Sequence, residues 1–193
     1  MHGRRKTLKM GDIKPYDALF LDRDGVINVQ RRGDYVKSVD EFVFIEGSFE
    51  ALAILRGLFR HIFVVTNQRG VGKGLMAEEQ LENIHAYMLR EISSHNGKID
   101  KIYYCTDTNE DSPNRKPNIG MALQARHDFP NVDFSKSKMA GDSRSDMLFA
   151  NRADIPAILI GNKYPPEEIR QFTIEGHYSD LLTFARQLMR LEI

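Results

Sequence analysis

The chain has 193 residues, and its 27 Lys and Arg balance 27 Asp and Glu, giving a formal net charge of zero. This length favours one domain, and balanced charge argues against a dedicated nucleic-acid or membrane-surface binder. The single cysteine, Cys105, excludes an internal disulfide and is typical of a reducing compartment, and no apolar run approaches the ~20 residues of a membrane span. We expect a cytoplasmic monomer or weak oligomer, with residues 1–13 as a loose N-terminal arm and 14–193 as one domain.

Short apolar runs alternate along the chain with segments of helical spacing, a pattern typical of βα units and a parallel sheet. The runs predict strands at 17–21, 61–66, 101–105, 136–141 and 156–160. The helical segments are 48–60, 78–95, 118–128, 144–152 and a closing helix within 179–193. Between the first strand and the first helix, residues 29–47 predict a small extended flap. The fold class indicated is α/β with a doubly wound parallel sheet.

Polar side chains follow the predicted strands at their carboxyl ends. In chain order these residues are Asp22 and Asp24, Thr66 and Asn67, Arg115 and Lys116, then Asp142 with Asp146 one turn further on. Because a doubly wound sheet binds its ligand beyond the carboxyl ends of its strands, we expect these side chains to converge.

This set of residues suits phosphoryl transfer. A carboxylate nucleophile repels a phosphate dianion, so the site needs a divalent cation and a fixed positive charge. Mg²⁺ prefers the hard oxygen ligands that aspartates offer. Lys116 would neutralise the phosphoryl oxygens and Thr66 would supply a hydroxyl. Asp22 would then attack phosphorus, while Asp24 protonates the leaving alcohol and later activates water.

The segments that carry these residues read DRDGVIN, VTNQRGVGKG, RKPNIGM and AGDSRSDM. They resemble, in this order, the four motifs of the haloacid dehalogenase superfamily of phosphatases. The resemblance implies Asp22 as nucleophile, Asp24 as acid/base, Thr66 and Lys116 on the phosphoryl group, and Mg²⁺ on Asp22, Asp142 and the backbone carbonyl of Asp24. Two roles stay open for Asp146, a helper of the metal site or a first-turn acid of its helix.

The superfamily usually chooses its substrate with an inserted cap domain, and neither the 29–47 insertion nor the loop 105–115 is long enough for one. The resemblance is strongest to the capless heptose bisphosphate phosphatases, which remove the 7-phosphate of D-glycero-manno-heptose 1,7-bisphosphate. It places Asn28, Arg31, Asn67, Gln68, Arg69 and Arg115 near a phosphorylated small-molecule substrate. Histidinol phosphatases share most of these motifs. A receiver-like signalling domain also combines a strand-end Asp, a Thr and a Lys, and stays as an alternative of another class.

Two features depart from that group. Many members hold a structural zinc through a Cys-x-His and a Cys-x-Cys pair after the third strand. Here Cys105 stands at the first ligand position, but the His and both later cysteines are missing, so we predict no zinc. Ser143 stands where a Lys often follows the motif Asp. For the histidines, His61 and His85 among them, we expect packing or surface roles, because none has ligand spacing.

Overall fold

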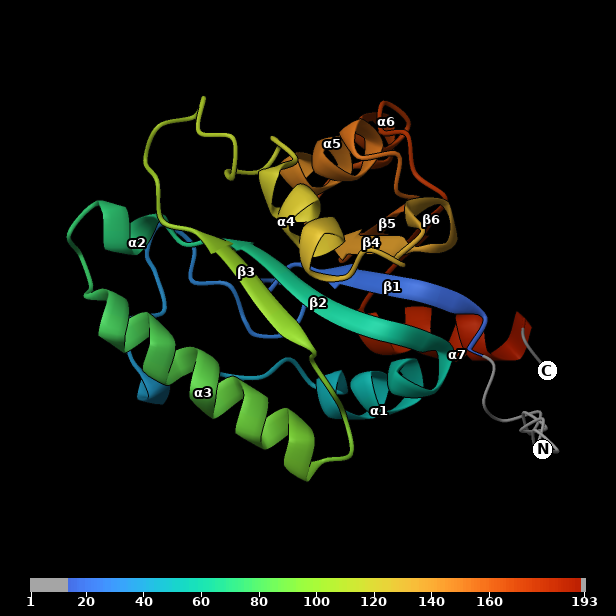
Figure 1. The fold of residues 1–193 in the computed structure, drawn as a ribbon, viewed down its shortest axis with the longest axis horizontal. Helices are drawn as coiled ribbons and strands as arrows, with labels where there is room; N and C mark the ends of the chain where they lie inside the picture. Colours follow the sequence, from blue (N-terminus) through green and yellow to red (C-terminus); the bar gives the residue numbers. More distant parts are fainter. Residues whose placement is uncertain (1–13, 192–193) are drawn as a thin grey trace, which may run out of the picture.

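The computed structural model describes residues 14–191, so the expected arm 1–13 lies outside the described part of the chain. Six parallel strands form one sheet in the order β3-β2-β1-β4-β5-β6 (Figure 1), which confirms the doubly wound α/β class. The strands are β1 Tyr16–Leu21, β2 Phe59–Asn67, β3 Lys101–Cys105, β4 Lys138–Gly141, β5 Ala157–Ile160 and β6 Gly176–Tyr178. Strand β1 pairs with β2 on one side and β4 on the other, so the strand order reverses there.

The buried part of strand β1, residues 18–21, is apolar because both faces of the sheet are covered. Leu19 and Leu21 point into one core layer, whereas Ala18 and Phe20 point into the other. Helices α1, α3 and α7 cover the first face, and α4 and α5 cover the second (Figure 1). The longer helices are α1 Ser48–Leu58, α3 Glu78–Ser94, α4 Gly120–Asp128, α5 Arg144–Arg152 and α7 Leu181–Leu191.

Some elements differ from the sequence-based expectation. The expected strand 136–141 begins instead with a 3-10 turn, Phe134–Lys136, before β4, and β2 starts two residues earlier than expected. Strand β6 was not predicted, because three partly exposed residues give no apolar run. The single-turn helices α2 Arg69–Gly72 and α6 Pro166–Ile169 are likewise too short to show helical periodicity.

The 29–47 insertion folds back over the carboxyl edge of the sheet without forming a domain. It contains one short 3-10 turn, η1 Val39–Glu41, and an antiparallel bridge between Asn28 and Phe44. Phe42 is buried and its ring lies 6.0 Å from that of Tyr87 on α3. The insertion is therefore a small flap attached to helix α3.

The loop after β3 carries the position where zinc was considered. Cys105 is buried, and its Sγ lies 3.8 Å from Asp107 Oδ2 and 3.9 Å from Ser112 Oγ, while the Ser112 hydroxyl donates to Asp107. Polar side chains of the loop thus bond to one another around the thiol. The absence of zinc stays a prediction.

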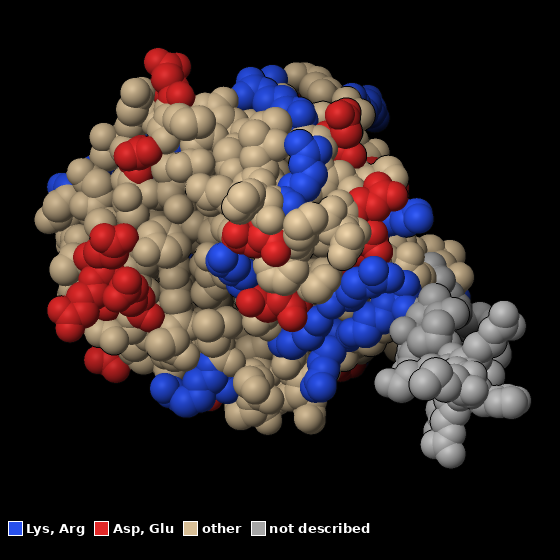
Figure 2. Space-filling model, in the orientation of Figure 1, with Lys and Arg blue, Asp and Glu red and all other residues tan. Residues whose placement is uncertain are grey.

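The surface carries charged side chains of both signs. Lys and Arg lie among Asp and Glu over the face drawn in Figure 2, without one sign dominating it. Within residues 14–191, none of the helices has the length and apolar character needed to cross a bilayer.

Candidate active site

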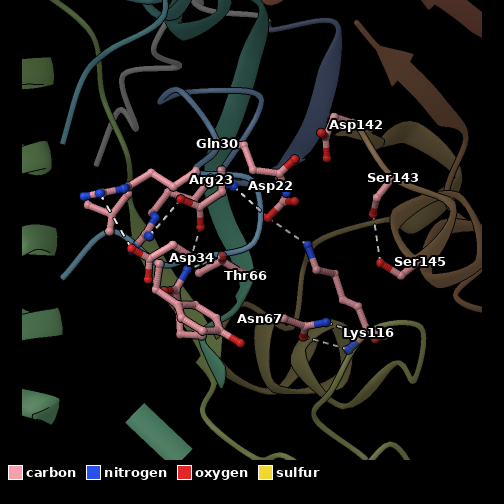
Figure 3. Close-up of a pocket in the computed structure, with 15 residues that line it drawn as sticks. Asp22, Arg23, Gln30, Asp34, Thr66, Asn67, Lys116, Asp142, Ser143 and Ser145 are labelled. Atoms are coloured by element: carbon pink, nitrogen blue, oxygen red, sulfur yellow. Dashed lines mark hydrogen bonds and ion pairs between the residues drawn. The ribbon is translucent and has the colours of Figure 1, made fainter. Parts of the chain in front are cut away.

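A cavity of about 240 Å³ opens at the carboxyl ends of β1, β2 and β4 (Figure 3). It is lined by Asp22, Arg23, Asp24, Gln30, Arg31, Asp34, Tyr35, Val36, Thr66, Asn67, Gln68, Lys116, Asp142, Ser143 and Ser145. The cavity thus gathers Asp22, Asp24, Thr66, Asn67, Lys116 and Asp142 from the set that the sequence singled out, and the flap adds one wall.

Lys116 lies at the centre of the charges. Its Nζ is 2.9 Å from Asp22 Oδ1 and 2.6 Å from Asp146 Oδ1, and it donates to the backbone carbonyl of Val65 at 2.7 Å. Asn67 holds the backbone of Lys116 through two 3.0 Å hydrogen bonds, one to its carbonyl and one from its N–H. The buried ammonium is therefore fixed in position, directed at Asp22 as Figure 3 shows.

The charges of this cluster do not balance by themselves. Burial raises the pKa of Asp22 to about 8, helped by the neighbouring carboxylate of Asp146 and only partly opposed by Lys116. Burial alone would lower the pKa of Lys116, but Asp146 and Asp22 outweigh it and raise that pKa. Burial and Asp146 also raise the pKa of Asp142. Three carboxylates face the buried ammonium of Lys116 and the more exposed ammonium of Lys163, and the remaining excess of negative charge favours a further cation.

Asp24 is held quite differently from Asp22. Its Oδ1 accepts from Arg23 Nη2 and Asn28 Nδ2, and its Oδ2 accepts from Gln68 Nε2, each at 2.9 Å. Gln68 also donates to Thr66 Oγ1 at 2.9 Å. Burial would raise the pKa of Asp24, but the Arg23 charge and the three hydrogen bonds hold that pKa below its usual range. The two acids of the motif thus have opposite environments.

The close approach of the first and fourth strands depends on Gly25. Its φ is +88°, which favours glycine, and a Cβ there would lie 2.4 Å from Asp142 Oδ2. Asp142 Oδ1 is buried without a hydrogen-bond partner among the described residues, and Lys163 Nζ is 3.6 Å from its Oδ2.

Oxygen atoms of Asp22, Asp142 and Asp146 lie within 4.8 Å of one another. An oxygen-only donor set of this kind fits Mg²⁺. The side chain of Asp24 is outside this group and accepts from three donors, so the metal role that the motif resemblance implied for Asp24 falls to its backbone carbonyl.

Asp146 is the first-turn acid of helix α5 and also pairs with Lys116, while its part in a metal site stays a prediction. Its Oδ2 accepts from the backbone N–H and the hydroxyl of Ser143 at 3.0 and 2.6 Å, which caps helix α5, and its Oδ1 pairs with Lys116. Ser143 is therefore part of the helix cap.

The residues expected near the substrate fall into three groups. Arg31, Asn67 and Gln68 line the cavity, Arg31 being ion-paired with Glu41 at 2.5 Å. Asn28 lies buried beneath Asp24. Arg69 and Arg115 are outside the cavity lining, and each has a buried guanidinium nitrogen without a hydrogen-bond partner among the described residues: Nε of Arg69 and Nη1 of Arg115. Burial and the proximity of Arg69 lower the pKa of Arg115.

The structure also adds residues that the sequence did not single out. Asp34, Tyr35, Val36 and Ser145 line the cavity, and so does Arg23, which lies between the two motif acids in the sequence. Nothing in the sequence indicated that the flap residues line the cavity, because their approach to it depends on how residues 29–47 fold back. Arg23 was visible inside DRDGVIN but carried no separate chemical role.

Comparisons with known proteins agree with this geometry. The HAD-hydrolase-like family model matches residues 113–182. A D-glycero-alpha-D-manno-heptose-1,7-bisphosphate 7-phosphatase of Campylobacter jejuni is 36% identical over 88% of this chain and 96% of its own. A D-glycero-beta-D-manno-heptose-1,7-bisphosphate 7-phosphatase of Vibrio cholerae is 40% identical over 72% of this chain and 77% of its own. The solved structure of D,D-heptose 1,7-bisphosphate phosphatase from B. bronchiseptica, complexed with magnesium and phosphate, superposes with a TM-score of 0.80 at 29% identity, covering 91% of this chain and 99% of that one.

Fold, site and relatives together define the class: the chain belongs to the haloacid dehalogenase-like hydrolases and is a phosphatase. Within that family it is similar to the D-glycero-D-manno-heptose-1,7-bisphosphate 7-phosphatases. The resemblance expected from the four motifs is thereby confirmed. The relatives named above are phosphatases, not receiver-like signalling domains.

Proposed function

We propose that this phosphatase removes the 7-phosphate of D-glycero-D-manno-heptose 1,7-bisphosphate through an aspartyl-phosphate intermediate. The observation that carries the proposal is the pairing of Asp22 with buried Lys116 beside a separately held Asp24, in a pocket at the carboxyl edge of the sheet. The substrate is inferred from the relatives named above.

The first half-reaction transfers the phosphoryl group to the protein. An Asp22 carboxylate oxygen attacks phosphorus, the bond from phosphorus to the sugar oxygen breaks, and Asp24 gives that oxygen a proton. Lys116 stabilises the charge on the phosphoryl oxygens. The three donors around Asp24 favour its carboxylate form, so the approach of a phosphate dianion would have to oppose them for Asp24 to carry a proton.

The second half-reaction restores the protein. Asp24, now ionised, takes a proton from a water molecule, whose oxygen attacks phosphorus. The bond between phosphorus and Asp22 breaks, releasing inorganic phosphate and the Asp22 carboxylate. This is the step for which the carboxylate form of Asp24 is suited.

A Mg²⁺ ion held by Asp22, Asp142 and the backbone carbonyl of Asp24 would offset the repulsion between nucleophile and phosphate. The unpartnered oxygen of Asp142 and the unbalanced carboxylates support this assignment.

A bisphosphate brings a second dianion that needs a partner of its own. Arg115 and Arg69 are sequence neighbours of pocket-lining residues, and each has one guanidinium nitrogen without a partner among the described residues, although Arg69 Nη2 donates to the carbonyl of Thr108. They suit the phosphate that is not cleaved, since guanidinium groups bind phosphate oxygens through paired N–H donors. These two arginines are our candidates for selecting a bisphosphate over a monophosphate.

Phosphate release from a substrate panel tests the proposal. The panel contains the α and β anomers of the heptose bisphosphate, histidinol phosphate and generic sugar monophosphates. We expect kcat/KM for one heptose bisphosphate anomer to exceed every monophosphate by ~100-fold or more, about 2.7 kcal/mol. Arg115→Ala should raise KM for the bisphosphate and leave p-nitrophenyl phosphate hydrolysis unchanged. Equal, weak rates throughout would contradict the substrate assignment, and dominant activity on histidinol phosphate would replace it.

A further inference from the structure

Arg23 is a charged side chain with almost no access to solvent. It is 1% exposed and the largest of the fully buried side chains. A buried guanidinium costs several kcal/mol unless its donors are matched, and a buried ion pair is poor evidence of stabilisation. Its position between Asp22 and Asp24 points instead to a role at the site.

The guanidinium connects the acid/base residue to helix α3. Arg23 Nη2 donates to Asp24 Oδ1 at 2.9 Å, and Nη1 lies 3.3 Å from His85 Nε2. The flap contributes Phe42, whose ring centroid is 5.9 Å from the Arg23 guanidinium carbon. Arg23 is therefore fixed from the helix and the flap while it holds Asp24.

His85 has the chemical form that this arrangement requires. Arg offers only donors, so the facing Nε2 must be an acceptor and the imidazole must be neutral. Burial, followed by the charge of Arg23, lowers the pKa of His85 to about 3, which keeps it neutral at physiological pH. His85 is absent from the residues that line the cavity, and its contact with Arg23 connects it to Asp24.

We propose that Arg23 and His85 are positioning residues, a pair that fixes the Asp24 carboxylate in the orientation its acid/base role needs. The pair spans 62 positions of sequence and leaves Asp22 and Lys116 to their separate network. The proposal rests on the acid/base role of Asp24 proposed above, and it is independent of which phosphate ester is the natural substrate.

Steady-state hydrolysis of p-nitrophenyl phosphate by His85 variants tests the pair. His85→Leu removes the acceptor, so we expect kcat to fall ~10-fold with KM within about twofold. His85→Gln places an amide oxygen near the position of Nε2 and should stay within about threefold of the parent kcat. His85→Asn carries the same amide on a shorter side chain and should resemble His85→Leu. His61→Leu, which removes a histidine whose ring lies 4.8 Å from that of Phe129 on another part of the sheet, is the matched control and should leave kcat unchanged.

A double-mutant cycle with Asp24→Asn separates positioning from general loss of packing. If His85 acts through Asp24, His85→Leu should cost less than twofold in the Asp24→Asn background, because the group being positioned is already disabled. An equal loss in both backgrounds, or a His85→Leu kcat within twofold of the parent, would overturn the proposal. If His85→Leu does not fold, equal kcat values for the Gln and Asn variants would overturn it. An Asp24→Asn variant with parental kcat would instead refute the acid/base role proposed for Asp24.

Discussion

At the scale of single residues, two adjacent acids of one motif have opposite surroundings. Asp22 shares a lysine with Asp146 and is forced toward its neutral form, whereas Asp24 receives three donors and is kept ionised. The chemistry assigned to each acid follows from these partners, since a metal-assisted nucleophile and a proton carrier need different environments.

Replacing Asp22 by Asn tests the nucleophile. The neutral amide is a poor nucleophile and a poor metal ligand, so we expect kcat to fall by ~10³-fold or more. Lys116 keeps its ion pair with Asp146, so the fold should persist, with cooperative thermal melting seen by circular dichroism. Phosphate release within tenfold of the parent would refute the assignment.

Because His85 is buried in its neutral form, we expect the free energy of unfolding to depend on pH. Its pKa is about 3 in the folded protein, below its ordinary value, so the unfolded chain binds a proton that the folded chain does not. As pH falls from about 6.5 toward 3, the parent should lose up to about 1.4 kcal/mol per pH unit relative to His85→Leu. Urea unfolding of both proteins between pH 7 and 4.5 measures this difference. Parallel stability curves would contradict a buried neutral histidine.

At the scale of elements, the turn after β1 determines how closely Asp142 approaches the motif acids. Gly25 makes this turn with positive φ and leaves no room for a side chain next to Asp142. The end of β4 is equally tight, because a Cβ on Gly141 would lie 2.3 Å from Asp146 Cβ. Two strand ends thus bring backbone against carboxylate, which a larger residue would prevent.

Gly25→Ala should therefore impair the site more than the fold. Positive φ costs Ala roughly 1 kcal/mol wherever it occurs, and at Gly25 the methyl also displaces Asp142. We expect at least ~100-fold loss of kcat/KM. Gly74→Ala is the matched control, because Gly74 has a φ of +68° and nothing within 4 Å of its Cβ position. It should lose similar stability and keep its activity. Equal activities of the two variants would contradict the role of Gly25.

At the scale of the whole molecule, the sheet brings together like charges that are more than 100 positions apart in sequence. Asp22 follows β1 and Asp142 follows β4, and these strands are hydrogen-bonded neighbours although β2 and β3 lie between them in the chain. The folded chain thus holds carboxylates together that repel one another, so a bound cation should stabilise the folded state as well as support activity.

Magnesium should raise the melting temperature of the protein. At 100 times its Kd, a ligand that binds only the folded state adds about 2.7 kcal/mol, which corresponds to several degrees here. Asp142→Asn should abolish most of that shift. EDTA should remove phosphatase activity and excess Mg²⁺ should restore it. Full activity of the metal-free protein would contradict the charge argument.

The sequence by itself determined the α/β class, most strand and helix positions, and the identity of the residues at the strand ends. These features are local: apolar runs, helical spacing and four ordered motifs are readable without knowing which segments touch. Strand β6 and the single-turn helices were not predicted, because elements of three or four residues carry too little periodicity.

Only the tertiary structure decided which contacts each of those residues makes, and hence the chemical role it suits. The bond from Gln68 to Asp24, the ion pair of Asp146 with Lys116, and the contact of His85 with Arg23 each join segments that are far apart in the sequence. Such contacts depend on the packing of side chains between distant elements, for which a single sequence gives no periodic signal. The motif residues are thus visible in the chain, but their protonation and orientation follow from what is packed around them.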